Sequence, residues 1–424
     1  MRTDGLNFDN IPPLSIPYGF FATAPLFGVL AGLVLLFQPQ ALTARWDPAA
    51  LALVHLLTLG FAAQIMLGAL CQVMPVVSSQ PIPLSRTQAL LVRGCISLGT
   101  VLLSLTFLFP GPILFSLTLA AFVIGFGLFI SRLIQALIKI RPAGHTLVSI
   151  RLAAFCLLIT LIAGVILLWW RSSPQTAPLA PILNTDQHAL WGIQGWGLLL
   201  VVGVSFQVIP MFHVAPDFPA RVQRWLPGAL MLSLLLGTVL DGSAAIALMA
   251  LSKLLVLGYC ALASRHLRQR RRKLLDYTVR FWQLALGCIA LSMVVNLATL
   301  GWPELPNRLP LAELSAILFG FGGLLAVIFG MLQKIVPFLL YLHLQRQCLT
   351  QPEKLLTLPN MKQLISTARS KRQWWLHCTA LCGLLIALWL PLLTPLAALL
   401  LIADFVWLGW TLHQAFALYR QHLN

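Results

Sequence analysis

The sequence predicts an all-α membrane protein with about twelve transmembrane helices in three repeated four-helix blocks. Of its 424 residues, 59% are hydrophobic and only 9% are charged, whereas a soluble globular domain carries roughly a quarter charged residues. The apolar runs are long enough to cross a bilayer core about 30 Å thick, which needs roughly 20 residues per helix. An internal repeat, which divides the chain into similar parts, is the third observation.

A motif of about twenty apolar residues recurs three times. The first copy, HLLTLGFAAQIMLGALCQVMP, begins at His55 and ends at Pro75, and the second, HALWGIQGWGLLLVVGVSFQVIP, begins at His188 and ends at Pro210. The third copy, LSAILFGFGGLLAVIFGMLQKIVP, ends at Pro337 and has no histidine at its start. We therefore expect three similar blocks, each of which carries the motif on its second helix.

Breaker residues and basic loops mark the expected boundaries. A polar tail at 1–16 precedes blocks at 17–142, 143–276 and 277–424, which together form one integral membrane domain. The expected helices lie, in chain order, near 18–37, 50–77, 87–109, 112–138, 149–170, 181–212, 226–240, 243–264, 279–300, 310–342, 374–392 and 394–418.

The net charge of +17 carries information about topology. Basic residues gather in the loops within 132–151, 221–224, 265–280 and 346–372. The positive-inside rule then predicts a multi-pass protein of the bacterial inner membrane with both termini in the cytoplasm. We interpret the run RHLRQRRRK at 265–273 as a solvated loop beside anionic lipid head groups, and we expect no nucleic-acid partner.

His55 and His188 are the strongest candidates for a functional site. Ionisable groups at membrane depth are costly and usually face the protein interior. Both histidines open a motif helix, so they share a level near the expected outer face. At about 100° per residue they point about 160° apart relative to the Gly/Gln/Pro stripe, which would aim both rings at one space between adjacent motif helices. Two such imidazoles could ligate a haem iron, or each could bond to a carbonyl at the interface.

Other polar residues suggest a second kind of site. A lysine or aspartate within apolar sequence must be paired, neutral or in contact with water, so a polar path and a structural network are both open interpretations. The candidates for a polar path are Gln72, Gln207, Lys253, Glu313, Lys334 and Asp404. For Glu313 the alternative is a surface pair with Arg308. The remaining histidines expected near cytoplasmic ends, with ordinary interfacial roles, are His145, His266, His343, His377, His413 and His422.

Two glycines on the motif helices, Gly60 and Gly195, are candidates for cofactor binding. Glycine lets a backbone or a flat cofactor approach closely, although most glycines in membrane helices only permit helix packing. Signatures of soluble enzymes are missing from the sequence, including phosphate-binding glycine loops, nucleophile elbows and HExxH.

Three blocks of four helices, with a histidine opening the second helix, resemble the catalytic subunit of the haem-copper oxidases. His55 stands where that family has a ligand of its low-spin haem, and His188 stands at the helix-six position. The segment RWLPGALMLSLLLGTVL has no histidine, and Ser315 and Ile317 occupy the places of the helix-ten pair. The resemblance therefore implies a related fold without the binuclear centre that reduces oxygen.

A closer resemblance is to the NnrS-like family of bacterial membrane proteins. It is carried by the stretch at 55–75, which starts with a histidine followed by Gly-Phe-Ala-Ala, and by HALWGIQG at 188–195. That resemblance implies a link to nitric-oxide stress and denitrification, with haem and copper as cofactors. A tryptophan that often follows the first proline in the family is missing, and the second motif continues as Pro210-Met-Phe-His-Val in place of the family's Gly-His-Thr-Gly-Arg ending.

The main expectation is a protein that binds b-type haem, with copper also possible, through His55 and His188. Its role would lie in respiratory or nitric-oxide-related metabolism, as an electron-transfer, sensing or protective component with respiratory or denitrification redox partners. One alternative is a transporter or permease with a polar path through the helix ring. Another is an assembly or scaffold subunit without a cofactor.

Overall fold

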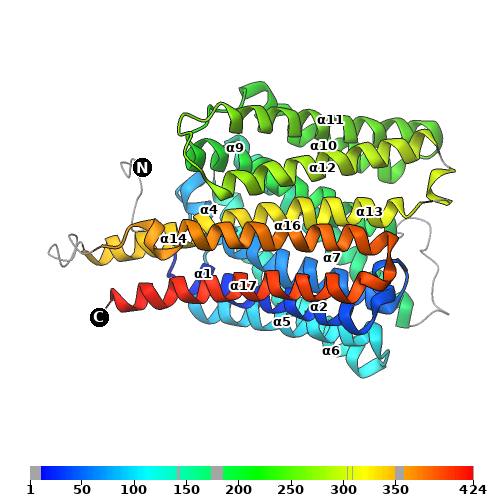
Figure 1. The fold of residues 1–424 in the computed structure, drawn as a ribbon, viewed down its shortest axis with the longest axis horizontal. Coiled ribbons are helices and arrows are strands. Elements are labelled where there is room, and N and C mark those ends of the chain that lie inside the picture. The colour runs from blue at the N-terminus through cyan, green and yellow to red at the C-terminus, as the bar shows by residue number, and fades with distance from the viewer. Residues whose placement is uncertain are drawn as a thin grey trace.

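The computed structural model describes residues 11–140, 144–172, 185–302, 304–307, 309–348 and 358–423. These residues form helices and connecting loops, with no β-strand among them. Within the same residues, eleven helices are long and apolar enough to cross a membrane. The long helices run along one common axis, and the first and last described parts of the chain lie at the same end of the bundle (Figure 1), which we call the terminal end.

Each expected segment is helical. In chain order the long helices are α1 and α2 (Ser15–Thr23, Pro25–Phe37), α3, η3 and α4 (Pro48–His55, Leu56–Ala63, Gln64–Ser78), α5 (Arg86–Leu108), α6 (Pro112–Lys139), α7 (His145–Ser172), α8, η5 and α9 (Thr185–Leu190, Trp191–Leu198, Leu199–His213), α10 (Ala220–Val239), α11 (Gly242–Arg268), α12 (Tyr277–Gly301), α13, η7 and α14 (Leu311–Ile317, Leu318–Leu325, Ala326–Cys348), α16 (Thr367–Trp389) and α17 (Thr394–Gln421). Short helices are η2 (Pro39–Leu42), η6 (Leu305–Asn307), α15 (Met361–Leu364) and η9 (Pro391–Leu393).

One helix that the sequence predicts to span the membrane is not among the eleven candidates. It is α16, which corresponds to the expected segment near 374–392. Its first turns carry Arg369, Lys371 and Arg372, so only its second part is apolar. The coarse prediction of an all-α membrane protein is confirmed, whereas the number twelve and the three-block organisation stay predictions.

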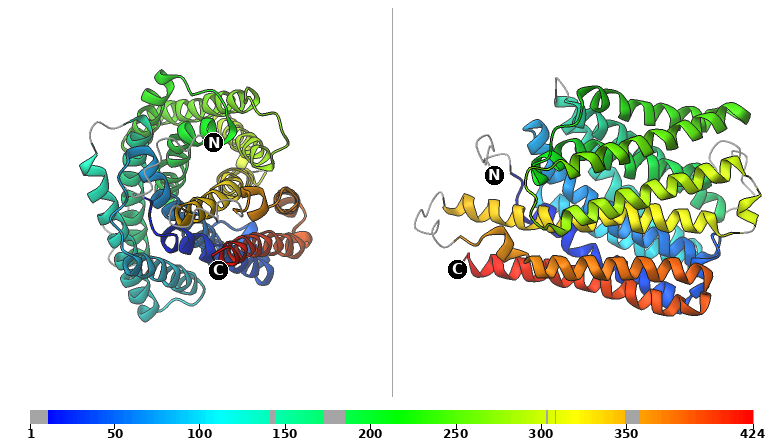
Figure 2. Two further views of the ribbon diagram at one scale, coloured as in Figure 1. Left: turned by 90° about the vertical axis from the view of Figure 1, so that its left-hand side faces the viewer. Right: turned by 45° about the horizontal axis from the view of Figure 1, so that its top comes forward.

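The three motif helices form the centre of the bundle. In the spans Pro48–Ser78, Thr185–His213 and Leu311–Cys348, 61%, 67% and 78% of the most apolar window is buried, whereas the other eight candidate spans are 28% to 50% buried. Figure 2 shows the helices end on, packed around this central region. The outer helices expose large apolar side chains that suit a lipid environment.

Every motif helix is interrupted by an eight-residue π-helical segment. The π segments end at Ala63, Leu198 and Leu325, and the interval to the motif proline is the same in all three copies. π-helical turns are rare and occur often at functional sites. Each motif proline lies inside a helix that continues past it, as membrane helices tolerate.

Equivalent motif glycines make equivalent close contacts. A β-carbon on Gly203 would lie 2.1 Å from Ser149, and one on Gly195 would lie 2.9 Å from Cys156, both on α7. In the first motif copy the equivalent glycines face Phe20 and Phe27, and in the third copy they face Phe281 and Cys288 on α12. In all three copies the two contacts on the neighbouring helix are seven residues apart, so glycine at these positions lets the motif helix pack closely against the helix that precedes it.

Candidate bis-histidine site

His55 and His188 lie side by side. His55 is the last residue of α3 and directly precedes a π segment. His188 lies in α8, shortly before another π segment. Their ring centroids are 6.3 Å apart and the ring planes differ by 18°. The helices α4, α9 and α14 run toward the terminal end (Figure 1). Because both histidines precede such a helix in the chain, their rings lie toward the opposite end of the bundle. The structure therefore brings together the two residues that the sequence singles out.

Each imidazole is fixed by one hydrogen bond to a backbone carbonyl. His55 Nδ1 lies 2.7 Å from the oxygen of Leu51, and His188 Nδ1 lies 3.1 Å from the oxygen of Thr160. A carbonyl can only accept, so Nδ1 carries the proton in both rings and Nε2 keeps its lone pair. This is the tautomer in which a neutral histidine binds a metal through Nε2 and is oriented through Nδ1.

The separation of the rings matches one metal held between them. An imidazole nitrogen lies about 2.0 to 2.1 Å from a bound metal, so two rings that ligate it from opposite sides have centroids about 6 Å apart. Among the described residues, no three His, Cys, Asp or Glu side chains come together. A metal at this place would need its other ligands from a prosthetic group, as a porphyrin supplies four nitrogens to haem iron.

Aromatic and basic groups surround the two imidazoles. The Phe107 ring lies 5.2 Å from that of His55, and the Arg171 guanidinium lies 5.8 Å from the centre of the Phe107 ring. Arg45 forms an ion pair with Asp186, two residues before His188. The site thus combines two imidazoles, an aromatic ring and two arginines at one end of the bundle.

A glycine lies beside the second imidazole at a position that sequence reasoning missed. A β-carbon on Gly164 would lie 3.0 Å from His188 Cε1, so this residue of α7 leaves room for the ring. The two glycines proposed from the sequence lie elsewhere. A β-carbon on Gly60 would lie 2.3 Å from the Phe27 ring, and one on Gly195 would lie 2.9 Å from Cys156 and 3.0 Å from Leu234. Both glycines therefore permit close helix packing, and their role in cofactor binding stays a prediction.

The structure does not collect the candidates for a polar path in one place. Gln72 and Gln207 both line a cavity between α4, α9 and α14. Lys253, on α11, has its Nζ 3.4 Å from the Met249 carbonyl of its own helix, and α11 lies across the bundle from the Asp404 helix α17 (Figure 1). Glu313 is half-buried at the start of the third motif helix, and its possible partner Arg308 lies outside the described residues.

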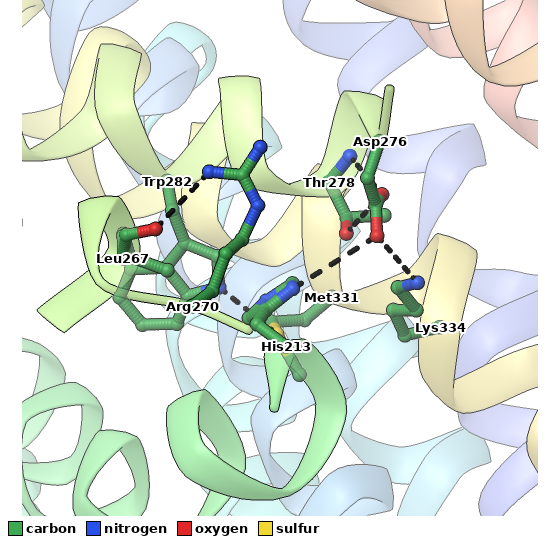
Figure 3. Close-up of polar contacts among 8 residues, drawn as sticks. All are labelled: His213, Leu267, Arg270, Asp276, Thr278, Trp282, Met331 and Lys334. Atoms are coloured by element: carbon green, nitrogen blue, oxygen red, sulfur yellow. Dashed lines mark hydrogen bonds and ion pairs between the residues drawn. The ribbon is translucent and has the colours of Figure 1, made fainter. Parts of the chain in front are cut away.

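Lys334 belongs to a polar cluster at the terminal end (Figure 3). Its Nζ lies 2.7 Å from Asp276 Oδ2, and Thr278 donates hydrogen bonds to Asp276 Oδ1. Burial opposes ionisation of Asp276, but the Lys334 charge and these hydrogen bonds hold the pKa of the carboxyl below its usual value. His213 Nδ1 lies 4.0 Å from Oδ2 of the same carboxylate.

A second histidine site was missed. His377 Nδ1 lies 2.8 Å from Asp404 Oδ2, and Gln373 donates a hydrogen bond of 2.7 Å to Asp404 Oδ1. His377 and Asp404 are both 0% exposed, so the expectation that His377 has an interfacial role is wrong. The only signal in the sequence is the four-residue spacing of Gln373 and His377, which places both on one face of α16 but does not show that this face is buried.

Comparison with known proteins assigns no family. No model of a protein family matches this sequence, and no curated protein matches it. The site itself must therefore carry the functional argument.

Proposed function

We propose that this chain is a multi-pass membrane protein that binds one b-type haem between His55 and His188. The observation that carries the proposal is the pair of imidazoles with centroids 6.3 Å apart, each of which has its Nδ1 tied to a carbonyl and its Nε2 left free to bind. An interfacial histidine bonded only to a carbonyl would explain one such ring, but not two rings brought together from different parts of the chain.

The donor set fits haem iron better than a bare ion. Two imidazoles complete the coordination of an iron that already has four porphyrin nitrogens, whereas a bare zinc ion prefers four protein ligands. Copper with only these two histidines remains the alternative occupant. Arg171 supports haem, since an arginine is suited to hold a carboxylate of the kind that such a group carries.

Haem at this place would supply one-electron chemistry. His55 and His188 would hold the group, the Leu51 and Thr160 carbonyls would orient the two rings, and Phe107 would help to keep water away. Electron transfer, sensing or protection fits better than oxygen reduction, because the sequence lacks the histidines of a binuclear centre.

The proposal includes the architecture and setting that the resemblance implies. The equivalent π segments and glycine contacts support three repeated blocks, as in the haem-copper oxidase catalytic subunit. The distribution of basic loops supports an inner-membrane location with both termini in the cytoplasm. The link to respiratory or nitric-oxide-related metabolism, and to redox partners there, rests on the resemblance to the NnrS-like family.

An optical spectrum with metal analysis of the purified protein tests the proposal. We expect a Soret band and about one haem per chain, both lost in His55→Ala and in His188→Ala. His266→Ala is the matched control, because His266 is also tied through Nδ1 to a carbonyl, that of Pro216, and has no second imidazole as a neighbour. A colourless wild-type protein supplied with haem would contradict the proposal.

A second candidate function, a permease, is favoured by one observation. The central cavity adjoins a polar vestibule of about 590 Å³ at the terminal end, and both are lined by Gln207 and Met211. Under this proposal Lys253 and Asp404 would not line the path. Colourless protein that is stabilised by a transported solute would favour the permease over the haem protein.

A further inference from the structure

Two arginines of α16 are stacked on two tryptophans of α17 at the terminal end. Arg369 Cζ lies 5.1 Å from the centre of the Trp410 ring, and Arg372 Cζ lies 5.5 Å from the centre of the Trp407 ring. The centroids of the two tryptophan rings are 4.8 Å apart. Because α16 and α17 lie side by side and run in opposite directions (Figure 1), the earlier arginine meets the later tryptophan. The two helices therefore present two neighbouring arginine–tryptophan stacks.

The two guanidinium groups have no acidic partner in the described part of the chain. There, the ion pairs of the protein include neither Arg369 nor Arg372. The one acidic residue within α16 and α17 is Asp404, which is 0% exposed and already hydrogen-bonded. A guanidinium carries five N–H donors at its edge, and stacking on an aromatic ring uses only its face. The donors of both arginines are therefore available to an anion.

The stacks lie at the level expected for lipid head groups. Beyond them, α16 continues as a mainly apolar stretch between Trp375 and Trp389, which are 52% and 51% exposed. Exposed tryptophans are typical of the two levels at which a membrane helix leaves the hydrocarbon core. Arg369 and Arg372 precede Trp375 in the first two turns of α16, so they lie just outside the hydrocarbon core.

We propose that the two stacks form a binding site for one anionic phospholipid, whose phosphate is held by Arg369 and Arg372 together. Arginine can give a phosphate two parallel N–H donors, and stacking already fixes the plane of each guanidinium. The two arginines are three residues apart, which places neighbouring side chains on a helix about 5 to 6 Å apart. Trp375, one turn further into the membrane, offers the acyl chains an exposed apolar ring, so the site suits a lipid better than free phosphate.

Native mass spectrometry of the full-length protein in detergent, titrated with phosphatidylglycerol or phosphatidylcholine, tests the inference. The wild type should bind phosphatidylglycerol more tightly than phosphatidylcholine. The double variant Arg369→Gln and Arg372→Gln should lose on the order of tenfold in apparent affinity for phosphatidylglycerol, because two charge-assisted contacts with the phosphate are removed. Its affinity for phosphatidylcholine should change much less.

The double variant Arg221→Gln and Arg224→Gln is the matched control. Arg221 and Arg224 have the same spacing in the first turns of α10, and both are exposed. Arg224 stacks at 5.4 Å on Trp225 of its own helix, so the control removes the same charge without a stack between two helices. It should bind phosphatidylglycerol as the wild type does.

A variant that keeps the charge covers the case in which the glutamine variant does not fold. Arg369→Lys with Arg372→Lys retains both positive charges but not the planar fork, so it should bind phosphatidylglycerol more weakly than the wild type does. The site lies at the opposite end of the bundle from His55 and His188. These variants should therefore leave the haem spectrum unchanged, and the two proposals fail separately.

Three results would overturn the inference. One is an equal affinity of the wild type for the two lipids. Another is an equal loss of affinity in the α16 and α10 glutamine variants, which would mean that only the total positive charge of this end attracts the lipid. The third is displacement of phosphatidylglycerol from the wild type by an equal concentration of inorganic phosphate, which would make this a site for free phosphate.

Discussion

His55 and His377 both lie inside the helix bundle and both are held through Nδ1, but they are held by different partners. His55 bonds to a carbonyl of its own helix and faces the ring of His188. His377 bonds to the carboxylate of Asp404 on another helix. The His55 and His188 rings lie beside each other without a hydrogen bond between them among those that the structure gives, whereas His377 donates a hydrogen bond to Asp404.

The side chains packed around the two histidines also differ. The His377 ring packs at 4.4 Å against Phe321 and at 4.7 Å against Phe329, so aromatic rings fill the space where a ligand would bind. His377 and Asp404 therefore hold α16 against α17. The comparison separates a histidine that joins two helices from a pair of histidines whose binding role stays a proposal.

The largest effect on stability should come from breaking the pair of His377 and Asp404. Asp404→Leu leaves His377 Nδ1 buried without its acceptor, whereas Gln373 keeps its hydrogen bond to the backbone carbonyl of residue 404. Removing one partner of a buried pair costs about 3 to 5 kcal/mol. Denaturant unfolding in detergent measures the loss. Asp241→Leu, at an exposed position in a loop, is the control and should change stability by less than about 0.5 kcal/mol. Equal stabilities for the two variants would show that the His377 and Asp404 pair does not hold the helices together.

A glycine substitution tests whether the neighbourhood of His55 is packed by protein. Gly60→Ala places a β-carbon 2.3 Å from the Phe27 ring, so we expect a loss of about 1 to 3 kcal/mol from overpacking. Gly127→Ala has no atom within 4 Å of the new β-carbon and should be neutral or slightly stabilising. Measured by the same unfolding assay, a neutral Gly60→Ala would mean that Phe27 does not fill this space.

The pair of His55 and His188 should contribute little to stability in the absence of a cofactor. His55→Ala removes a half-buried ring whose protein hydrogen bond is to one helical carbonyl, so cofactor-free protein should lose about 1 kcal/mol or less. Its unfolding midpoint should therefore stay far closer to that of the wild type than the midpoint of Asp404→Leu. A loss as large as that of Asp404→Leu would make the His55 and His188 pair a structural feature.

The smallest effect concerns the pair at the terminal end and depends on pH. Because the pKa of Asp276 is lower in the folded protein, the stabilisation by Asp276 is fully present above the ordinary carboxyl pKa of about 3.9 and is lost as the pH falls below it. Asp276→Asn should therefore flatten the stability profile of the protein below about pH 4. A profile identical to that of the wild type would mean that Lys334 does not stabilise this carboxylate.

The positions of the helices and of the first site could be predicted, and the reasons are physical. Long apolar runs and basic loops fix where helices cross a membrane. The meeting of His55 and His188 followed from a two-residue difference in their spacing to the motif glycine. That difference survives because both intervals contain one π segment of the same length, so the distortion affects both rings alike.

The remaining features depend on contacts that no local pattern reveals. The π segments involve apolar residues typical of any membrane helix. Asp404 was recognisable as costly, but its partner His377 comes from a helix with a basic start, and only packing against Phe321 and Phe329 shows that it is buried. The cavity between α4, α9 and α14 forms only when all three motif helices are packed together.

Rescue by free imidazole is the most direct test of the claim that two imidazoles hold one haem. His188→Gly removes one of the two imidazoles and leaves a space of the shape of an imidazole ring. We predict that His188→Gly loses the Soret band of the wild type, as His188→Ala does, and that free imidazole added together with haem restores it. A spectrum of His188→Gly that equals that of the wild type before imidazole is added would contradict the claim.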